Sequence, residues 1–146
     1  MARRIAVIQG HPDPHDKHFG HATAVAYAKG AESVGHEVRF IYVAKLDFSF
    51  LHTKEEFEKG TPVDAIRLAQ ETIHLAEHLV VSHAPRALHT ALRLGCAGAR
   101  EFITGSSNHH PLWLGTMPAI LKAFLEQTLR PGFAFAYADG KGMPKK

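Results

Sequence analysis

The first 81 residues alternate between short apolar runs and longer stretches with helical periodicity. The apolar runs cover residues 4–10, 37–43 and 78–81, and their β-branched and aromatic content predicts strands. Between them, residues 20–34 and 63–77 repeat apolar side chains every three or four positions, as helices with one buried face do. The order strand, helix, strand, helix, strand predicts an α/β protein whose doubly wound parallel sheet lies between helix layers.

Glycine and proline positions support these boundaries. Gly35 follows the first predicted helix, at the position where a left-handed cap residue belongs. Pro62 is placed at the first helical position of the second helix. A further helix, opened by Pro118, is predicted over residues 119–130, and a helical turn over residues 54–59.

The composition is that of one soluble globular domain. The chain has 146 residues, 45% of them apolar and 21% charged. No apolar run reaches the roughly 20 residues that a membrane span needs, and the first residues lack a secretory leader. The one cysteine, Cys96, excludes an internal disulfide. We therefore expect a cytoplasmic protein with no membrane insertion.

The net charge of +3 does not by itself indicate a nucleic-acid partner. The basic residues are scattered, and their two concentrations, Arg3-Arg4 and residues 141–146, carry no interleaved aromatic side chains. A mild basic excess also suits anionic small molecules. We expect a small-molecule ligand and no nucleic acid.

Residues 82–110 interrupt the regular pattern with a segment rich in alanine, arginine, histidine and glycine. A helix is possible over residues 86–100 and a strand over residues 101–104. A connection of this length is uncommon inside a compact domain. We interpret residues 1–146 as a single domain in which residues 82–110 form an atypical insertion.

A histidine-bearing loop follows the first predicted strand and leads into the first helix. In a doubly wound sheet, ligands bind near the carboxyl ends of the strands, and the start of a helix favours an anion. Ring N–H groups of His11 and His18, with backbone amides near Phe19, could therefore bind a diphosphate. The alternative is a simple turn at Asp13-Pro14 with solvated histidines. Neither a P-loop nor a dinucleotide-binding glycine motif is present.

A second unusual loop reads Pro111-Leu112-Trp113-Leu114-Gly115-Thr116-Met117-Pro118. It places the only tryptophan between two leucines, directly before a predicted helix. Backbone polar groups beside apolar surface suit a flat heteroaromatic ring such as that of a flavin. The alternative is a turn in which Trp113 is only a core residue.

Together these loops resemble the NAD(P)H:quinone oxidoreductase (NAD(P)H dehydrogenase, quinone) branch of the flavodoxin-like proteins. The block from the tryptophan loop into the following helix is the longest matching segment. The matching segments are residues 8–14, 18–19, 35–38, 111–127 and 130–135.

The resemblance implies a flavodoxin-like fold, bound FAD or FMN, and hydride transfer from NAD(P)H to a quinone by a ping-pong route. It also implies a homodimer, with the flavin site close to the subunit interface. By position, the flavin phosphate and ribityl side would be held by His11, His18 and Phe19, with His21 a weaker candidate. The isoalloxazine ring would be lined by Pro111, Leu112, Trp113, Leu114 and Gly115.

The chain departs from the family pattern in two ways. Residues 82–110 separate the third strand from the tryptophan loop, which follows that strand almost directly in the family. The family pattern also continues with further strands, a flavin-contacting loop and a last helix. We therefore expect a C-terminally truncated domain with a three-stranded sheet and exposed edges. No catalytic side chain can be assigned.

The sequence is compatible with three functions. The first is a flavin-dependent oxidoreductase, and the second is a non-catalytic regulatory subunit, such as that of a potassium-efflux system. The third is a metal site, which is disfavoured because adjacent histidines rarely both reach one ion and no carboxylate lies at helical spacing from them. Its candidate ligands would be His83, His89, His109 and His110.

Overall fold

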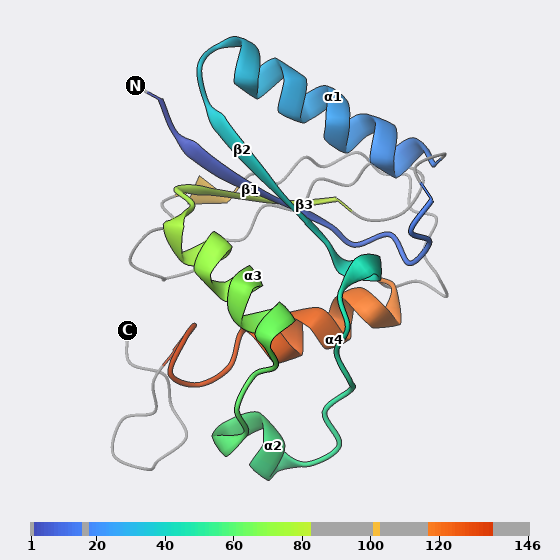
Figure 1. The fold of residues 1–146 in the computed structure, drawn as a ribbon, viewed down its shortest axis with the longest axis vertical. Helices are drawn as coiled ribbons and strands as arrows, with labels where there is room; N and C mark the ends of the chain where they lie inside the picture. Colours follow the sequence, from blue (N-terminus) through green and yellow to red (C-terminus); the bar gives the residue numbers. More distant parts are fainter. Residues whose placement is uncertain (1, 16–17, 83–100, 103–116, 136–146) are drawn as a thin grey trace.

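The computed structural model describes residues 2–15, 18–82, 101–102 and 117–135, and every structural statement below concerns these residues. The predicted alternation of strands and helices is confirmed (Figure 1). In chain order the elements are β1 (Arg4–Gln9), α1 (Phe19–Ser33), β2 (Glu37–Tyr42), the 3-10 turn η1 (Val43–Lys45), α2 (Lys54–Lys59), α3 (Asp64–Leu75), β3 (His78–Ser82), β4 (Glu101–Phe102) and α4 (Ala119–Thr128).

The strands form one parallel sheet in the order β2-β1-β3-β4. β1 is central: Ile5 pairs with Val38 of β2 on one side and with His78 of β3 on the other. The expectation of three strands is wrong, because β4 adds a fourth by pairing Glu101 with His78. This strand confirms the first two residues of the possible strand at 101–104, and the other two lie outside the described residues.

Helices cover both faces of the sheet, which gives the predicted three layers (Figure 1). Alternate residues of β1 enter two separate cores, since successive side chains of a strand point to opposite faces. Val7 packs with Ala24 on the α1 face, whereas Ile8 packs with Ile66 and Phe124 on the face of α3 and α4. This double burial explains why β1 reads as an unbroken apolar run.

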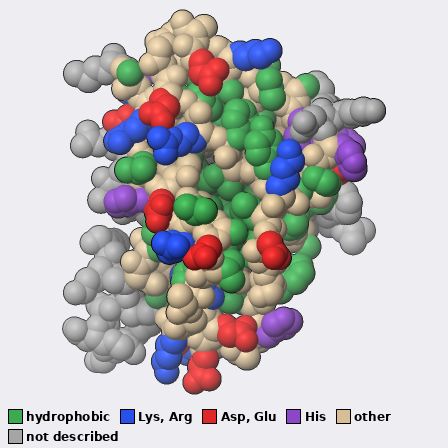
Figure 2. Space-filling view, viewed as in Figure 1, with side chains coloured by type: hydrophobic (Ala, Val, Ile, Leu, Met, Phe, Trp, Pro, Cys, Tyr) green, Lys and Arg blue, Asp and Glu red, His purple; other side chains and the backbone are tan. Residues whose placement is uncertain are grey.

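Apolar side chains also reach the surface. Figure 2 shows them gathered down the middle of the face seen in Figure 1, with charged side chains mostly around them. Val25 on α1 and Leu68 on α3 are among the exposed ones. No helix in the described part of the chain has the length and apolar character needed to cross a bilayer.

The helix ends agree with the sequence at α1 and differ at α3 and α4. Gly35 has a φ of 86° and closes α1 as predicted, with its N–H bonded to the carbonyl of Glu32. Pro62 precedes the N-cap of α3 and so does not occupy its first turn. Pro118 is the N-cap of α4, which ends at Thr128, two residues before the predicted end.

Side chains at the end of α4 hold the long connection between β2 and α3. The Gln127 amide donates to the carbonyl of Ser49 at 2.8 Å. The buried Arg130 guanidinium donates to the carbonyls of Glu56 and Gly60, both at 2.8 Å. The two bonds from Arg130 satisfy backbone carbonyls at the carboxyl end of α2. The connection, which contains only the turn η1 and the short helix α2, is therefore held against the end of α4.

The first turn of α4 is packed against the end of β1. A side-chain carbon at Gly10 would lie 2.6 Å from a terminal carbon of Leu121, which is fully buried. Because Leu121 is fully buried in a close-packed core, a methyl group at Gly10 would force its side chain to shift. The contact therefore fixes where α4 begins relative to the loop that follows β1.

We expect Gly10→Ala to lower the free energy of unfolding by about 1–3 kcal/mol, because it overpacks the contact with Leu121. Urea unfolding followed by circular dichroism measures the change. The double variant Gly10→Ala/Leu121→Ala should be less destabilised than the sum of the two single variants. Additive losses would contradict a direct steric contact.

Candidate functional site

The carboxyl ends of β1 and β3 meet the start of α1. The N–H of Gly10 donates to the carbonyl of Ser82 at 2.6 Å, which joins the two strand ends. The carbonyl of Gly20, in the first turn of α1, accepts hydrogen bonds from the Gln9 amide at 3.0 Å and the Ser82 hydroxyl at 3.3 Å. β2 and β3 flank β1 on opposite sides, so this is the switch point at which doubly wound proteins bind ligands.

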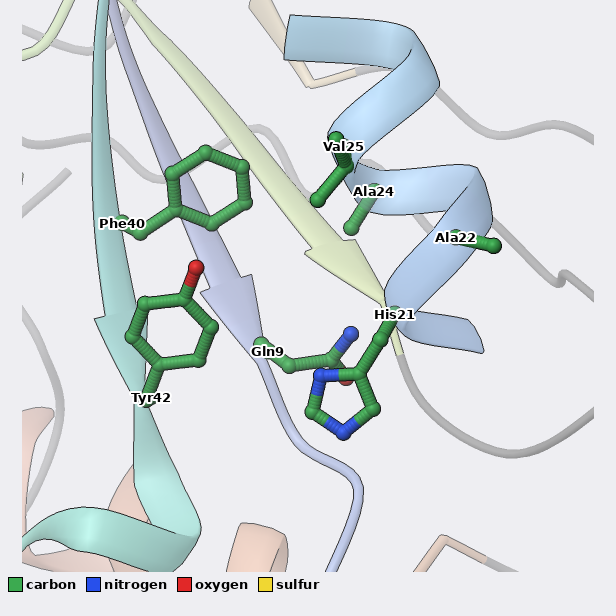
Figure 3. Close-up of a pocket in the computed structure, with 7 residues that line it drawn as sticks. All are labelled: Gln9, His21, Ala22, Ala24, Val25, Phe40 and Tyr42. Carbon is green, nitrogen blue, oxygen red and sulfur yellow. The ribbon is translucent and has the colours of Figure 1, made fainter. Parts of the chain in front are cut away.

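Gln9 also fixes the loop that leaves β1. Its side-chain oxygen accepts the N–H of His11 at 3.1 Å, while its amide N–H holds Gly20. Figure 3 shows Gln9 beside His21 at the end of the strand. Because Gln9 is buried and both ends of its amide are bonded, it is a rigid link between strand, loop and helix.

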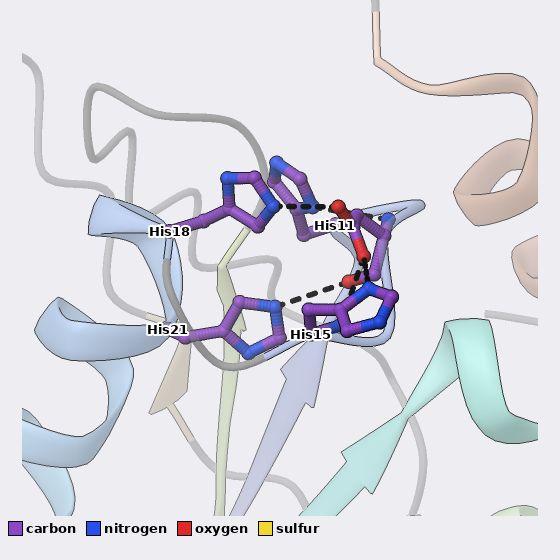
Figure 4. A network of polar contacts seen from close by, with 5 residues as sticks. His11, His15, His18 and His21 are labelled. Atoms are coloured by element: carbon purple, nitrogen blue, oxygen red, sulfur yellow. Dashed lines mark hydrogen bonds and ion pairs between the residues drawn. The ribbon is translucent and has the colours of Figure 1, made fainter.

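Asp13 is the centre of a polar cluster that contains four histidines (Figure 4). Its N–H donates to Nδ1 of His11 at 3.1 Å, and its carbonyl accepts from Nε2 of His21 at 3.3 Å. Its carboxylate accepts from the backbone N–H and Nδ1 of His15, at 2.9 and 2.5 Å, and from Nε2 of His18 at 2.7 Å. We call these five residues the Asp13 cluster.

Hydrogen bonds keep Asp13 ionised. The backbone N–H of His15, followed by the side chains of His18 and His15, holds the pKa of the Asp13 carboxyl well below its usual range. The carboxylate is partly exposed, with 39% of the side chain accessible. The cluster is thus a loop folded around one fixed negative charge.

His11 presents a preset hydrogen-bond donor. Burial, helped by the neighbouring His18, lowers the pKa of His11, so the ring is neutral at pH 7. Its Nδ1 accepts the Asp13 N–H, which leaves the proton of the neutral ring on Nε2. No described residue accepts a hydrogen bond from that Nε2–H, although His11 is only 6% exposed.

The start of α1 offers further donors. Its N-cap, His18, makes no side-chain capping bond, and the first turn contains no acidic residue. The N–H groups of His21 and Ala22 donate to the His18 carbonyl, whereas those of Phe19 and Gly20 have no acceptor among the described residues. The ring of His11 stacks on that of His18, with centroids 4.3 Å apart, so the His11 ring lies beside the start of the helix. This set of donors suits an anion such as a phosphate group.

The structure brings together three of the nine residues predicted for the flavin site, namely His11, His18 and His21. Phe19 is the first residue of α1, and its side chain lies outside the described structure. So do the whole predicted ring-binding loop and the four histidines considered for a metal, in residues 83–100 and 103–116. Among the described residues, no three histidine, cysteine or acidic side chains are arranged to hold a metal ion.

Sequence reasoning missed the part played by Asp13, which it considered only as part of a turn. The available signal was local: an aspartate bonds readily to the N–H two residues further on, as Asp13 does with His15. Gln9 was also missed, although a lone amide at the end of an apolar strand needs buried partners.

The predicted ring-binding loop joins the described chain beside the Asp13 cluster. Residues 111–116 connect directly to Met117 and so to α4, whose first turn packs against Gly10 through Leu121. Gly10 in turn precedes His11. The two loops singled out in the sequence are therefore attached to neighbouring points of the fold.

We expect Asp13→Asn to lower the melting temperature at neutral pH. Because the folded state depresses the pKa of Asp13, the carboxylate stabilises the protein above about pH 4, the ordinary pKa of aspartate, and loses this effect as the pH falls further. The difference between wild type and variant should thus be constant from pH 6 to about pH 4 and shrink from there towards pH 2.5.

Thermal unfolding across this pH range measures that difference. Asp64→Asn is the matched control, because its carboxylate is 88% exposed in an ion pair with Arg67. A difference between wild type and Asp13→Asn that stays constant down to pH 2.5 would contradict a stabilising carboxylate at the centre of the cluster.

Comparisons with known proteins agree with this architecture. A family model described as a flavodoxin-like fold matches residues 109–146. The structure is similar to an NAD(P)H:quinone oxidoreductase from Methanothermobacter marburgensis, with a TM-score of 0.63 and 19% identity over 94% of this chain and 58% of that one. It is also similar to a protein provisionally assigned as a quinone reductase from Klebsiella pneumoniae, with a TM-score of 0.60 and 16% identity over 92% and 48% of the two chains.

This chain thus spans about half to three-fifths of the length of these two proteins. No curated protein matches the sequence. The predicted flavodoxin-like α/β fold is confirmed, and the chain resembles the NAD(P)H:quinone oxidoreductases that share this fold.

Proposed function

We propose that this protein is a flavin-dependent oxidoreductase that transfers a hydride from NAD(P)H, through bound FAD or FMN, to a quinone-like acceptor. The observation that carries the proposal is the placement of hydrogen-bond donors for an anion at the switch point of the sheet. The Nε2–H of His11 and the uncapped start of α1 lie where flavodoxin-like proteins bind their ligand.

The flavin phosphate would be held by His11, His18 and the backbone N–H of Phe19. His11 stacks on His18, the N-cap of α1, so the His11 ring lies beside the start of the helix. Since Nε2 of His18 already bonds to the Asp13 carboxylate, His18 would supply ring contact while His11 supplies the hydrogen bond. His21 has a supporting part, because its Nε2 donates to the Asp13 carbonyl and helps to fix the loop. The cluster thus orients the donors before the ligand arrives.

The isoalloxazine ring would lie against Pro111, Leu112, Trp113, Leu114 and Gly115. The attachment of this segment to α4, beside Gly10, supports that assignment. A bound flavin supplies the hydride chemistry itself, while the protein binds it, orients it and excludes water. No side-chain nucleophile is needed for this reaction.

A non-catalytic regulatory subunit is the second candidate, since it would use the same binding site without turnover. Both candidates would bind the ligand through the described residues of the Asp13 cluster, so turnover alone distinguishes them. The family resemblance further leads us to propose a homodimer with the flavin close to the subunit interface.

The visible absorption spectrum of the purified protein, loaded with FAD or FMN, tests the function. Flavin bands that bleach on adding NADPH or NADH under nitrogen, and return on adding a quinone, are the expected result. Bound flavin that neither nucleotide reduces would support the regulatory subunit. A protein that binds neither flavin would contradict both candidates.

We expect His11→Asn to weaken FMN binding by about 10–100-fold, because a hydrogen bond to a charged group contributes about 1.5–3 kcal/mol. The asparagine side chain keeps an acceptor for the Asp13 N–H but loses the donor that His11 carries at Nε2. Riboflavin, which lacks the phosphate, should bind the variant and wild type equally.

Isothermal titration with FMN and riboflavin measures both affinities. His74→Asn, on an exposed position of α3, is the control and should change neither. If His11→Asn lowers the affinity for FMN and for riboflavin equally, the phosphate does not bind at His11.

A further inference from the structure

A hollow lies at the edge of the sheet opposite to the Asp13 cluster, where β1 and β3 begin and α1 ends. Figure 1 shows the amino ends of β1 and β2 beside the carboxyl end of α1. The volume of the hollow is about 360 Å³, within the roughly 300–1,000 Å³ found for small-molecule sites. We call it the amino-edge pocket, and its lining residues are Ile5, Ala26, Tyr27, Gly30, Ala31, His36 and His78.

The floor and one wall of the amino-edge pocket are apolar. Ile5 of β1 is 3% exposed and belongs to the core on the α1 face of the sheet. α1 contributes a stripe of residues at helical spacing, namely Ala26, Tyr27, Gly30 and Ala31. Tyr27 is the large side chain of this stripe, and its neighbours are small. The wall therefore suits a flat ring, which can pack against the ring of Tyr27.

Gly30 keeps the pocket open on the side of α1. A side-chain carbon at this position would have no atom within 4 Å. The backbone of Gly30 is helical, so its conformation does not require glycine. A larger side chain can therefore be placed here without a steric clash, and it would occupy the pocket.

Two imidazole rings form the polar end of the pocket. The backbone N–H of Arg3 donates to Nδ1 of His36 at 3.2 Å, so the proton of the neutral His36 ring is on Nε2. The Arg3 guanidinium donates through Nη1 to Nε2 of His78 at 3.3 Å, which leaves a proton on Nδ1 of His78. Each ring thus carries an N–H donor, and the charge of Arg3 lies directly beside His78.

The charge around these donors favours an anion. Among the described residues, no acidic side chain lines the amino-edge pocket. The carboxylates at the starts of β2 and β3 have partners of their own, since Glu37 pairs with Arg39 at 2.8 Å and Glu77 accepts the Arg4 N–H at 3.1 Å. Burial raises the pKa of Tyr27, so its hydroxyl adds no negative charge at neutral pH.

We propose that the amino-edge pocket binds a flat aromatic carboxylate, with its ring against Tyr27 and its carboxylate towards His36 and Arg3. A carboxylate bonds to ring N–H and guanidinium groups more strongly than a neutral acceptor does. Gly30 is about 16 Å along the helix from Phe19, at roughly 1.5 Å per residue, so this site is separate from the proposed flavin site. The inference goes beyond the proposed function and does not depend on it.

Cinnamate is the probe, and cinnamamide is its uncharged analogue. Isothermal titration measures the affinity for each, with and without saturating FMN. We expect cinnamate to bind one site per chain, at least about tenfold more tightly than cinnamamide, because the site is built around charge. FMN should not change this affinity. Displacement of cinnamate by FMN, or no saturable binding of cinnamate, would overturn the inference.

Gly30→Leu fills the pocket, and Gly30→Ala is the matched control at the same position. Both replacements remove a glycine from a helix interior, so neither should destabilise α1, which circular dichroism checks. We expect Gly30→Leu to weaken cinnamate binding by at least about tenfold and Gly30→Ala by less than about threefold, because only leucine extends into the space of the ring. An unchanged affinity in Gly30→Leu would place cinnamate elsewhere and overturn the inference.

His36→Asn tests the polar end of the pocket. Asparagine keeps an acceptor for the Arg3 N–H but lacks the donor that His36 carries at Nε2. We expect the variant to weaken cinnamate binding by about tenfold and cinnamamide binding by less than about threefold, because the bond to a charged acceptor is the stronger one. An equal loss for both compounds would contradict a carboxylate at His36.

The same titrations separate this inference from the flavin function. If FMN does not bind but cinnamate binds and Gly30→Leu weakens it, the amino-edge pocket stands and the flavin function is wrong. If FMN binds equally to wild type and Gly30→Leu while cinnamate does not bind to either, the flavin site stands and the amino-edge pocket is wrong.

Discussion

The carbonyl oxygen of Gly20 accepts hydrogen bonds from Gln9 and Ser82, and the site depends on this contact. It fixes the start of α1 against the carboxyl ends of β1 and β3, the two strands between which the sheet reverses its order. Buried polar groups require partners, so these bonds have few alternatives in the folded chain. The start of the helix is consequently held at the one edge where a doubly wound sheet binds ligands.

The Asp13 cluster depends on this fixed position of the helix start. Gln9 holds the N–H of His11, and Asp13 then orients His11, His18 and His21 through its backbone and carboxylate. A preset loop loses little conformational freedom on binding, which favours affinity for a phosphate.

Periodicity predicted β1, α1, β2, α3 and β3 from the sequence, because each element buries a regular set of side chains. The contacts of Asp13 could not be predicted in the same way. Asp13 meets His21, eight residues further on, only because the loop folds back over the start of α1. The pocket between Val25 of α1 and Tyr42 of β2 likewise requires the two elements to lie side by side, which no local pattern encodes. The strand at residues 101–102 pairs with β3 within a segment of irregular composition, so the four-stranded sheet was missed.

We propose that one flavin contacts both loops singled out by the sequence. Hydrogen–deuterium exchange of the protein with and without added FAD or FMN tests it most directly. We expect slower exchange in residues 11–21 and 111–117 together, with little change in α2 or at the exposed end of α3. Protection confined to one of the two loops, or absent from both at saturating flavin, would contradict a shared flavin site.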